Sequence, residues 1–529
     1  MRILFYWICA GVLLVNGLVA LFFPMILWSL LILGPIMILG MCDALQTKQT
    51  IRRNFPVLGN FRYLFETIRP EINQYFIESN SDGVPFSREQ RSIVYQRSKK
   101  ELDTLPFGTQ KAVYADGYEW ATHSLMPVHV APESLRLTIG GESCTKPYSA
   151  SILNVSAMSY GSLSKNAILA LNGGAKLGGF AHNTGEGGLS PYHLQPGGDI
   201  IWQIGTGYFS CRERDGTFSA ALFAERAAMP NVKMIEIKLS QGAKPSHGGI
   251  LPAAKVSKEI SEIRGVPMGE TVISPPAHSS FSSPRGLCEF IAKLRELSGG
   301  KPVGFKLCVG KKREFVAICK AMVETGILPD FITVDGGEGG TGAAPLEFSN
   351  SIGYPLRDGL VFVHNSLVGF GLRNRIRLIA SGRVVTGFDM ITAFALGADL
   401  CNSARAMMMA LGCIQALRCN SNECPTGVAT QKPELVKGLS VSHKTTRVAN
   451  FQNQTVQSAA EIMGAIGVSS PIDIQPWHVL RRTGSGEIKN FGEIYRFLEA
   501  GSLLKDPPPP GFVNAVRAST PESFAAIDA

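Results

Sequence analysis

Short apolar runs rich in β-branched residues recur from Ser151 onward, and segments with helical spacing separate them. The runs end in turn residues and lie at 151–156, 180–183, 232–240, 271–276, 301–308, 331–337, 376–382 and 398–404. Runs of this length predict strands buried on both faces of a parallel sheet. Eight βα units over about 260 residues are typical of a TIM barrel. A doubly wound α/β sheet gives a similar alternation, so periodicity alone leaves that alternative open.

The N-terminal pattern differs, because no charged residue occurs from Ile3 to Cys42. A bilayer span takes roughly 20 apolar residues, so this run predicts two short helices, about 3–22 and 25–42. Proline lacks an amide donor and clashes inside a helix, which places the break at Phe23-Pro24. A cleaved signal peptide has a shorter apolar region of ~7–15 residues. A single tilted span stays open as an alternative.

Basic residues flank this segment, with Arg2 before it and Lys48, Arg52 and Arg53 after it. Because basic flanks prefer the cytoplasm, we expect a hairpin in the cell inner membrane and a cytoplasmic catalytic body. The net charge of +9 is partly concentrated in residues 44–112, where eleven Lys or Arg stand against seven Asp or Glu, which suits anionic membrane lipid. Basic residues interleaved with aromatic platforms are not found, which argues against nucleic-acid binding.

The chain of 529 residues, 45% of them hydrophobic, is long enough for one large domain with additions. We expect the transmembrane hairpin at 1–43, a mixed helical connector at 44–144, the barrel at 145–480 and a C-terminal extension and tail at 481–529. The composition is compatible with a homo-oligomer. In a cytoplasmic body the eleven cysteines are not a disulfide framework, so a tight cluster of them indicates metal binding or catalysis.

If the barrel is correct, its chemistry lies at the carboxyl ends of its strands. The segment NTGEGG (183–188) sets Glu186 among glycines that let a ligand approach the backbone. Later strand ends supply lysines, glycine turns and arginines, namely Lys238, Gln241, Lys244, Lys306, Gly336, Gly337, Gly382, Arg383, Ser403 and Arg405. A barrel commonly binds phosphate after its last two strands, where glycine amides and an arginine can pair with it. Each feature alone is common in turns, so the inference depends on their coincidence on one face.

Three cysteines, Cys413, Cys419 and Cys424, stand close together after the last predicted strand. No further Cys and no His lies between 413 and 431, whereas structural zinc takes four ligands. An iron–sulfur cluster with three cysteine ligands, most simply [3Fe-4S], fits this set better. Cys401 as a distant fourth ligand, or plain packing of the thiols, stays open.

Several motifs in order resemble the synthase domain of the glutamate synthase family. They are SAMSYGSLS (156–164), NTGEGG (183–188), QGAKP (241–245), VISPP (272–276), DGGEGGTGAAP (335–345) and C-x5-C-x4-C-P-T-G-V-A-T-Q (413–431). The resemblance covers about residues 145–480, and the whole chain with its apolar N-terminus resembles a stand-alone branch of that family. It implies a TIM barrel that holds FMN, a [3Fe-4S] cluster beside the flavin, and reduction of 2-iminoglutarate made from 2-oxoglutarate and ammonia.

The resemblance also implies roles for single residues. Glu186 matches the acid that handles ammonia and protons, and Lys244 matches the 2-oxoglutarate neighbourhood. The implied flavin neighbours are Ala157, Met158, Ser159, Gln241, Lys306, Gly336 and Gly337, with Gly382, Arg383, Ser403 and Arg405 near its phosphate, and the implied cluster ligands are Cys413, Cys419 and Cys424. A flavin needs a positive group near its ring, and an imine needs protonation before hydride arrives.

Two departures from the family pattern affect the expected substrates. The family usually continues after its lysine as G-E-G-G-Q-L-P, whereas residues 246–252 read SHGGILP and put Ile250 where the family has a substrate-contacting glutamine. The chain also shows no glutaminase domain and no Rossmann unit for a nicotinamide. We therefore expect ammonia from outside and electrons from an external donor such as a ferredoxin or a reductase subunit. Two alternatives stay open: the same machinery acting on another amine or oxo acid, as in N-methylglutamate synthesis, or an electron-transfer or scaffolding subunit without its own substrate.

Overall fold

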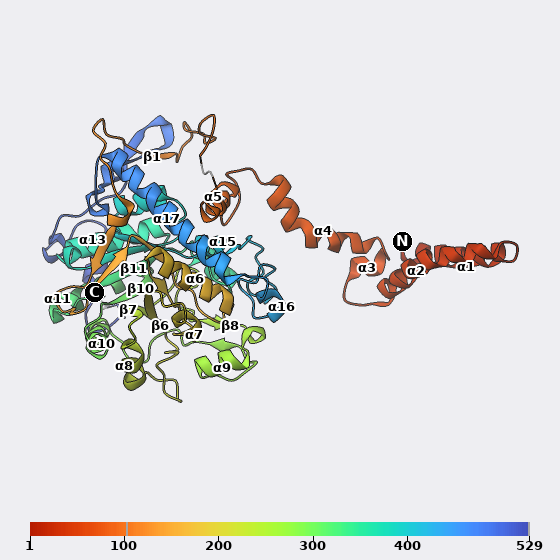
Figure 1. The fold of residues 1–529 in the computed structure, drawn as a ribbon, viewed down its shortest axis with the longest axis horizontal. Coiled ribbons are helices and arrows are strands. Elements are labelled where there is room, and N and C mark those ends of the chain that lie inside the picture. The colour runs from red at the N-terminus through yellow and green to blue at the C-terminus, as the bar shows by residue number, and fades with distance from the viewer. Residues whose placement is uncertain (102–103, 527–529) are drawn as a thin grey trace. The chain divides into compact units, whose positions relative to one another are not determined.

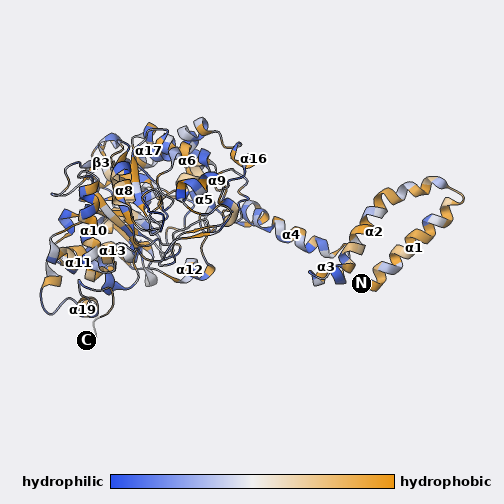
Figure 2. Cartoon of the chain, turned by 90° about the horizontal axis from the view of Figure 1, so that it is seen from below, coloured by the Kyte–Doolittle hydropathy of each residue, from blue (hydrophilic) through white to orange (hydrophobic). Residues whose placement is uncertain are grey.

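The computed structural model describes residues 1–101 and 104–526, and the chain divides into two compact units, Met1–Glu89 and Gln90–Ala529. The first unit begins with two apolar helices, α1 (Arg2–Ala20) and α2 (Leu30–Leu45), which lie side by side (Figure 1). A turn at Leu21 and Phe22 follows α1, and a 3-10 helix, Pro24–Ser29, leads into α2. Both helices are coloured as mainly hydrophobic in Figure 2, and the helical segments Arg2–Ala20 and Pro24–Leu45 are long and apolar enough to cross a bilayer. The predicted pair of helices is confirmed, and membrane crossing stays a prediction.

Polar contacts tie the end of this hairpin to the helices that follow, α3 (Thr50–Asn54) and α4 (Gly59–Ile72). The Asp43 carboxylate, which is buried near the end of α2, accepts hydrogen bonds from the Val57 amide at 3.0 Å and the Asn60 side chain at 2.5 Å. A buried carboxylate is costly unless it is paired. These contacts therefore hold the first turn of α4 against the end of the hairpin.

The second unit is built around a closed barrel of eight parallel strands, which confirms the predicted TIM barrel. Apolar and polar residues do not alternate strictly along these strands, because a strand in such a barrel is buried on both faces. The strands in chain order are β4 (Leu153–Val155), β5 (His182–Asn183), β6 (Ile200–Ile204), β7 (Val232–Lys238), β10 (Val303–Cys308), β11 (Phe331–Asp335), β12 (Arg377–Ser381) and β13 (Leu400–Ser403). The barrel closes where β13 pairs with β4, with Asn402 opposite Asn154.

One predicted barrel strand is wrong and one was missed. The run 271–276 does not enter the barrel, because β9 (Val272–Ile273) pairs antiparallel with β8 (Ile250–Leu251) in a separate two-stranded ladder. The missing barrel strand is β6, whose five residues are all buried. Both runs are short, apolar and β-branched, and only pairing with distant strands distinguishes them. The segment that begins at Lys238 therefore follows the fourth strand rather than the third.

Helices cover the outside of the barrel (Figure 1). The longest, α17 (Val441–Ile466), packs along α6 (Lys165–Gly178), and small residues permit the approach, since a Cβ on Gly174 would lie 2.6 Å from Val448. The other helices are α5 (Arg88–Lys99), α7 (Pro191–Leu194), α8 (Ala220–Ala227), α9 (Lys258–Arg264), α10 (Pro284–Leu297), α11 (Lys312–Thr325), α12 (Leu346–Ser351), α13 (Leu356–Gly369), α14 (Gly387–Ala395), α15 (Arg405–Leu411), α16 (Pro433–Val436), α18 (Phe491–Ile494) and α19 (Val513–Arg517).

A hairpin of β2 (Arg136–Ile139) and β3 (Tyr148–Ser151) closes the N-terminal end of the barrel. Its buried residues Ile139, Tyr148 and Ala150 form one apolar cluster with strand residues such as Met234 and Phe331. A further small sheet joins β1 (Glu119–Ala121), β14 (Val479–Arg482) and β15 (Ile488–Asn490). Because one end of the barrel is packed shut, polar chemistry is left to the carboxyl ends of the strands.

Candidate functional site

Glu186 lies in the turn after β5 and forms an ion pair with Lys238, the last residue of β7. Two glycines flank its side chain: a Cβ on Gly205 would lie 3.4 Å from the Cβ of Glu186, and a Cβ on Gly249 would lie 2.8 Å from its carboxyl carbon. Burial alone would raise the pKa of Glu186, but Lys238 and Lys244 outweigh that effect and lower it to about 2. Glu186 is therefore an anion held among cations.

Lys244 follows β7 and is 2% exposed. Its Nζ has no hydrogen-bond partner among the residues that the structure describes. Burial lowers the pKa of Lys244 to about 8, although the nearby Glu186 acts in the opposite direction. A buried ammonium without a partner is costly, so this group is suited to pair with an anionic ligand.

Lys306 projects from β10 and pairs with Asp335, the last residue of β11, at 3.1 Å. The same carboxylate accepts a hydrogen bond from the Gly242 amide at 3.0 Å and so fixes the loop that carries Gln241 and Lys244. Burial would lower the pKa of Lys306, but the carboxylates of Asp335, Glu236 and Glu186 raise it. Lys306 is thus a permanent cation inside the mouth of the barrel.

The loop after β4, which contains Ala157, Met158 and Ser159, packs against the Glu186 turn. Gly185 has a φ of +66°, and a Cβ at that position would lie 3.0 Å from the Ser159 nitrogen, so both the conformation and the close approach require glycine. The Met158 amide donates to the Asn183 carbonyl at 3.0 Å. These contacts bring the predicted flavin loop next to the predicted catalytic carboxylate.

The predicted phosphate end lies after β12 and β13. Arg405 donates to the Glu338 carbonyl at 2.7 Å, and Gly340 lies against its guanidinium. Burial and the neighbouring guanidinium of Arg383 lower the pKa of Arg405 to about 10. Ser403 donates to the Val384 carbonyl at 2.7 Å. Two guanidinium groups that repel one another fit a site for a doubly charged phosphate.

Glycines also line the approach to this end. A Cβ on Gly336 would lie 2.3 Å from the Glu338 carboxylate, and one on Gly337 would lie 2.9 Å from the Gly353 carbonyl. Gly382 is less constrained, with the Leu356 side chain 3.2 Å from its virtual Cβ. The protein's own atoms therefore pack closely against Gly336 and Gly337, and the role of these glycines beside a flavin stays a prediction.

The loop 413–424 holds the three predicted cluster ligands. Burial, and to a smaller extent the thiols of Cys419 and Cys424, raise the pKa of Cys413 to about 12, so the three groups lie within electrostatic reach of one another. No group of three or more His, Cys, Asp and Glu side chains that could hold a metal ion occurs in residues 1–101 and 104–526. A cluster, unlike a single ion, offers a different iron to each thiolate, so its ligands need not converge on one point. The donor set fits a cluster of this kind.

Sequence reasoning missed two side chains that support the site. Arg264, on α9, donates to the Tyr160 carbonyl at 2.7 Å and stacks 5.2 Å above the Phe209 ring. His278 bonds the Lys238 carbonyl at 2.9 Å and the Tyr208 hydroxyl at 3.0 Å. Burial lowers the pKa of His278 to about 4, so the imidazole is neutral. Neither Arg264 nor His278 follows a barrel strand, and no local pattern identifies them.

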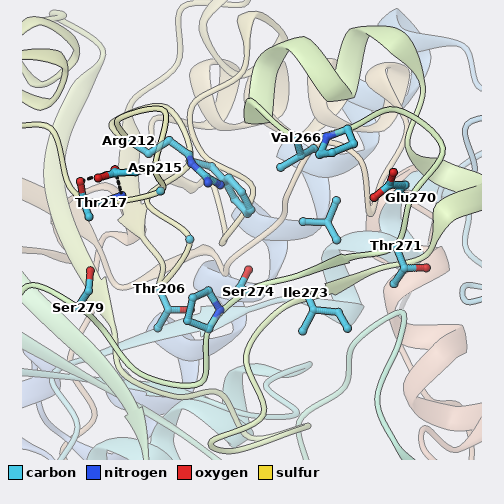
Figure 3. A pocket seen from close by; sticks show the side chains of 16 residues that line it. Thr206, Arg212, Asp215, Thr217, Val266, Glu270, Thr271, Ile273, Ser274 and Ser279 are labelled. Carbon is cyan, nitrogen blue, oxygen red and sulfur yellow. Dashed lines mark hydrogen bonds between the residues drawn. The ribbon is translucent and has the colours of Figure 1, made fainter.

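A cavity of about 460 Å³ lies beside the Glu186 turn, and Figure 3 shows its lining. Its wall includes Thr206, the residue after Gly205, and it carries Arg212 and Asp215 on one side and Glu270 on the other (Figure 3). Asp215 accepts hydrogen bonds from Thr217, which stabilise the turn rather than a ligand.

A closed parallel barrel with lysines, carboxylates and glycine turns gathered at its open end is a TIM-barrel enzyme. The conserved region of glutamate synthase matches residues 118–469. The chain is 38% identical over 493 residues to the glutamate synthase large subunit-like protein YerD of Bacillus subtilis, which covers 85% of this chain and 93% of YerD. The chain therefore belongs to the glutamate synthase family and is an oxidoreductase of the class that acts on CH–NH2 donors. The resemblance found in the motifs is confirmed.

Other relatives share less of the chain. The archaeal glutamate synthase (NADPH) of Methanocaldococcus jannaschii is 38% identical over 318 residues, which cover 60% of this chain and 59% of that protein. Among solved structures, a mandelate oxidase mutant with an FMN adduct gives a TM-score of 0.39 at 14% identity, covering 82% of this chain and 99% of the other. A flavocytochrome b2 mutant with pyruvate bound gives 0.42 at 14% identity, covering 80% and 85%.

Proposed function

We propose that this chain makes L-glutamate by reductive amination of 2-oxoglutarate, with ammonia and electrons supplied from outside. Ammonia adds to the keto carbon with loss of water, and the imine carbon then gains a hydride while its nitrogen gains a proton. The observation that carries the proposal is the buried Lys244 ammonium, which has no hydrogen-bond partner among the described residues and lies beside the Glu186–Lys238 pair. A substrate carboxylate would pair with the Lys244 ammonium, and an ammonium or iminium nitrogen would pair with the Glu186 carboxylate.

FMN would supply the hydride at this site, and a [3Fe-4S] cluster would pass single electrons to it. The residues that would hold FMN are Ala157, Met158, Ser159, Gln241, Lys306, Gly336 and Gly337 around the ring, and Gly382, Arg383, Ser403 and Arg405 at the phosphate. Lys306 keeps a positive charge near the ring because Asp335 and Glu236 raise its pKa. Cys413, Cys419 and Cys424 would bind the cluster.

The chain's own residues divide the remaining work. Lys244 orients the oxo acid through its carboxylate, and Glu186 holds the cationic nitrogen. Because the pKa of Glu186 is about 2, this carboxylate attracts positive charge rather than donating a proton in the free protein. The ammonium of Lys238, in contact with Glu186, is placed to give the imine its proton.

The proposal includes a membrane-anchored enzyme at the cell inner membrane. The hairpin of residues 1–43 would contact lipid, residues 44–144 would connect it to a cytoplasmic barrel at 145–480, and 481–529 would form the C-terminal extension. The electron donor would be a ferredoxin or a reductase subunit, and the body is compatible with a homo-oligomer. The length and apolar composition of α1 and α2 support the anchor.

Because of Ile250, the identity of the amine and of the oxo acid is the first part of the assignment to test. It is half-buried on β8 opposite Ile273, and it offers no hydrogen bond from its side chain. A substrate group that the family's glutamine would bind must therefore be recognised by another residue of this chain. The experiment must therefore distinguish glutamate synthesis from the alternative, in which the same machinery acts on another amine or oxo acid.

Anaerobic purification followed by flavin and iron analysis tests the cofactors, and stopped-flow reoxidation tests the reaction. We expect FMN, roughly three irons per chain, and rapid flavin reoxidation by 2-oxoglutarate with ammonium. Zinc in place of iron would contradict the cluster. Reoxidation by methylamine with 2-oxoglutarate, but not by ammonium, would replace glutamate with N-methylglutamate as the product. No reoxidation by any pair would indicate an electron-transfer subunit.

A further inference from the structure

The segment 249–255 contains β8 and precedes α9, and it touches both the Glu186 turn and the cysteine loop. Gly249 lies against the Glu186 carboxylate. Five residues later, the carbonyl of Ala254 accepts a hydrogen bond from the Asn422 side chain at 3.0 Å. Asn422 stands between Cys419 and Cys424, so this short segment joins the catalytic carboxylate to the cysteine loop.

Lys255 ends this segment and is buried, with 2% of its surface exposed. Its Nζ donates to the Ser162 carbonyl at 2.9 Å, in the loop that also carries Met158. Within the described ranges it forms no ion pair with a carboxylate, and the acidic groups that interact with it electrostatically are the thiols of Cys419 and Cys424. Burial of an ammonium is costly unless an anion compensates for it.

We infer that Lys255 is a positioning residue that raises the reduction potential of the iron–sulfur cluster and links the cysteine loop to the flavin loop. The inference rests on the cluster in the proposed function. A cluster bound by three thiolates carries net negative charge, and reduction by one electron adds to that charge. A fixed positive charge nearby stabilises the reduced form more than the oxidised form, and net charge is one determinant of such potentials.

The contacts on the two sides of the flavin loop support the linking role. On one side Lys255 binds the Ser162 carbonyl. On the other side Gln431, from the end of the cysteine motif, donates to the carbonyls of Gly161 at 3.0 Å and Leu163 at 2.9 Å. The carbonyls of Gly161, Ser162 and Leu163 thus accept hydrogen bonds from two sources, Lys255 and the Gln431 side chain at the end of the cysteine motif.

The experiment measures the midpoint potential of the cluster by an electron paramagnetic resonance titration of the full chain, with dithionite as reductant. Lys255→Met should keep iron and FMN and shift the cluster to a more negative potential, by at least a tenfold change in the oxidised-to-reduced ratio, which is about 59 mV for one electron. Lys255→Arg should restore the wild-type value. The matched control is Lys258→Met, since Lys258 is an exposed lysine three residues further on.

An unchanged potential in Lys255→Met with full iron content would overturn the inference, and so would an equal shift in Lys258→Met. If Lys255→Met loses iron while Lys255→Arg keeps iron and the wild-type potential, the charge is required and the inference stands. If Lys255→Arg also loses iron, the side chain acts by its shape and the inference fails. Wild-type protein with FMN but without iron would contradict the cluster itself, which is a separate and recognisable result.

Discussion

Single residues at the barrel mouth leave an excess of positive charge around one carboxylate. Glu186 interacts with Lys238, Lys244 and Arg264, and only the first of these is its direct ion-pair partner. Attraction to these cations explains why the pKa of Glu186 is lowered to about 2 although burial opposes it. An anionic substrate would balance the remaining charge, which is the main argument at this scale for an oxo acid.

Lys244→Ala and Glu186→Gln should therefore affect different kinetic constants. Loss of Lys244 removes a charged hydrogen bond worth ~1.5–3 kcal/mol, so KM for the oxo acid should rise roughly 10- to 100-fold at nearly constant kcat. Glu186→Gln removes the charge that holds the cationic nitrogen and orients Lys238, the proposed proton donor, so it should lower kcat by roughly 10²- to 10⁴-fold. Both variants should keep the FMN absorbance. Wild-type reoxidation rates in both would remove these residues from the mechanism.

The pKa of Lys244 also predicts a pH dependence. Burial lowers this pKa from its ordinary value to about 8, and a lysine is charged only below its pKa. The kcat/KM for the oxo acid should therefore be constant below pH 8 and fall as the pH rises above it. In Lys244→Arg this decrease should vanish, because a guanidinium stays protonated. The same decrease in the arginine variant would assign it to another group.

The cysteine loop gives a prediction that does not depend on the substrate. Cys419→Ser should lose the iron and keep FMN, because it removes one of three thiolate ligands. Cys144→Ser is the control, since Cys144 is half-exposed and lies outside the loop. Iron analysis and the visible absorption spectrum are sufficient measurements. Equal iron in both variants would show that Cys419 is not a ligand.

At the scale of elements, the local sequence pattern predicts most of the barrel strands, but it does not show which apolar runs belong to the barrel. Seven strands follow apolar runs visible in the sequence, whereas β6 escaped notice and the run around β9 was wrongly included. Isolated runs of this kind are equivalent until distant partners are known, because strand stability comes from cross-strand packing. Glu186 and Lys306 were accessible to prediction because the first follows a barrel strand and the second lies near the end of one, whereas Arg264 and His278 do neither.

The close approach of Gly249 to Glu186 predicts the effect of adding one methyl group at position 249. A Cβ there would lie 2.8 Å from the Glu186 carboxyl carbon, the flexible end of a side chain, so Gly249→Ala should fold normally and displace the carboxylate. Misplacement by about 1 Å can cost roughly 10²-fold in rate. Gly310→Ala is the matched control, since no atom lies within 4 Å of its virtual Cβ. Thermal unfolding and stopped-flow reoxidation should separate the two effects, and equal rates would contradict the placement of Glu186.

At the scale of the whole molecule, the apolar hairpin and the barrel belong to separate compact units, Met1–Glu89 and Gln90–Ala529. The barrel unit contains the flavin loop, the Glu186 turn and the cysteine loop. It also contains Tyr95 of α5, whose hydroxyl donates to the Cys413 carbonyl at 2.8 Å. The chemistry therefore needs no residue from α1 or α2.

Deletion of residues 1–45 should release a soluble protein that still binds FMN, whereas the full chain should sediment with membranes. The physical reason is that α1 and α2 carry the long uncharged run. A reporter fused after residue 55 should give a cytoplasmic signal, because basic residues flank the hairpin on both sides. A periplasmic signal would contradict the hairpin and favour a single span.

The pairing of β13 with β4 has a consequence for the order of events during synthesis. The barrel cannot close until residues 400–403 have left the ribosome, because they pair with residues 153–155. At ~5–20 residues per second, β13 follows the apolar hairpin by roughly 20 to 70 s. The N-terminal segment thus emerges long before the barrel can form. In a chain whose hairpin enters the bilayer, the nascent barrel completes its last ladder while already tethered to the membrane surface, and its exposed strand edges are kept at that surface and away from other chains in solution.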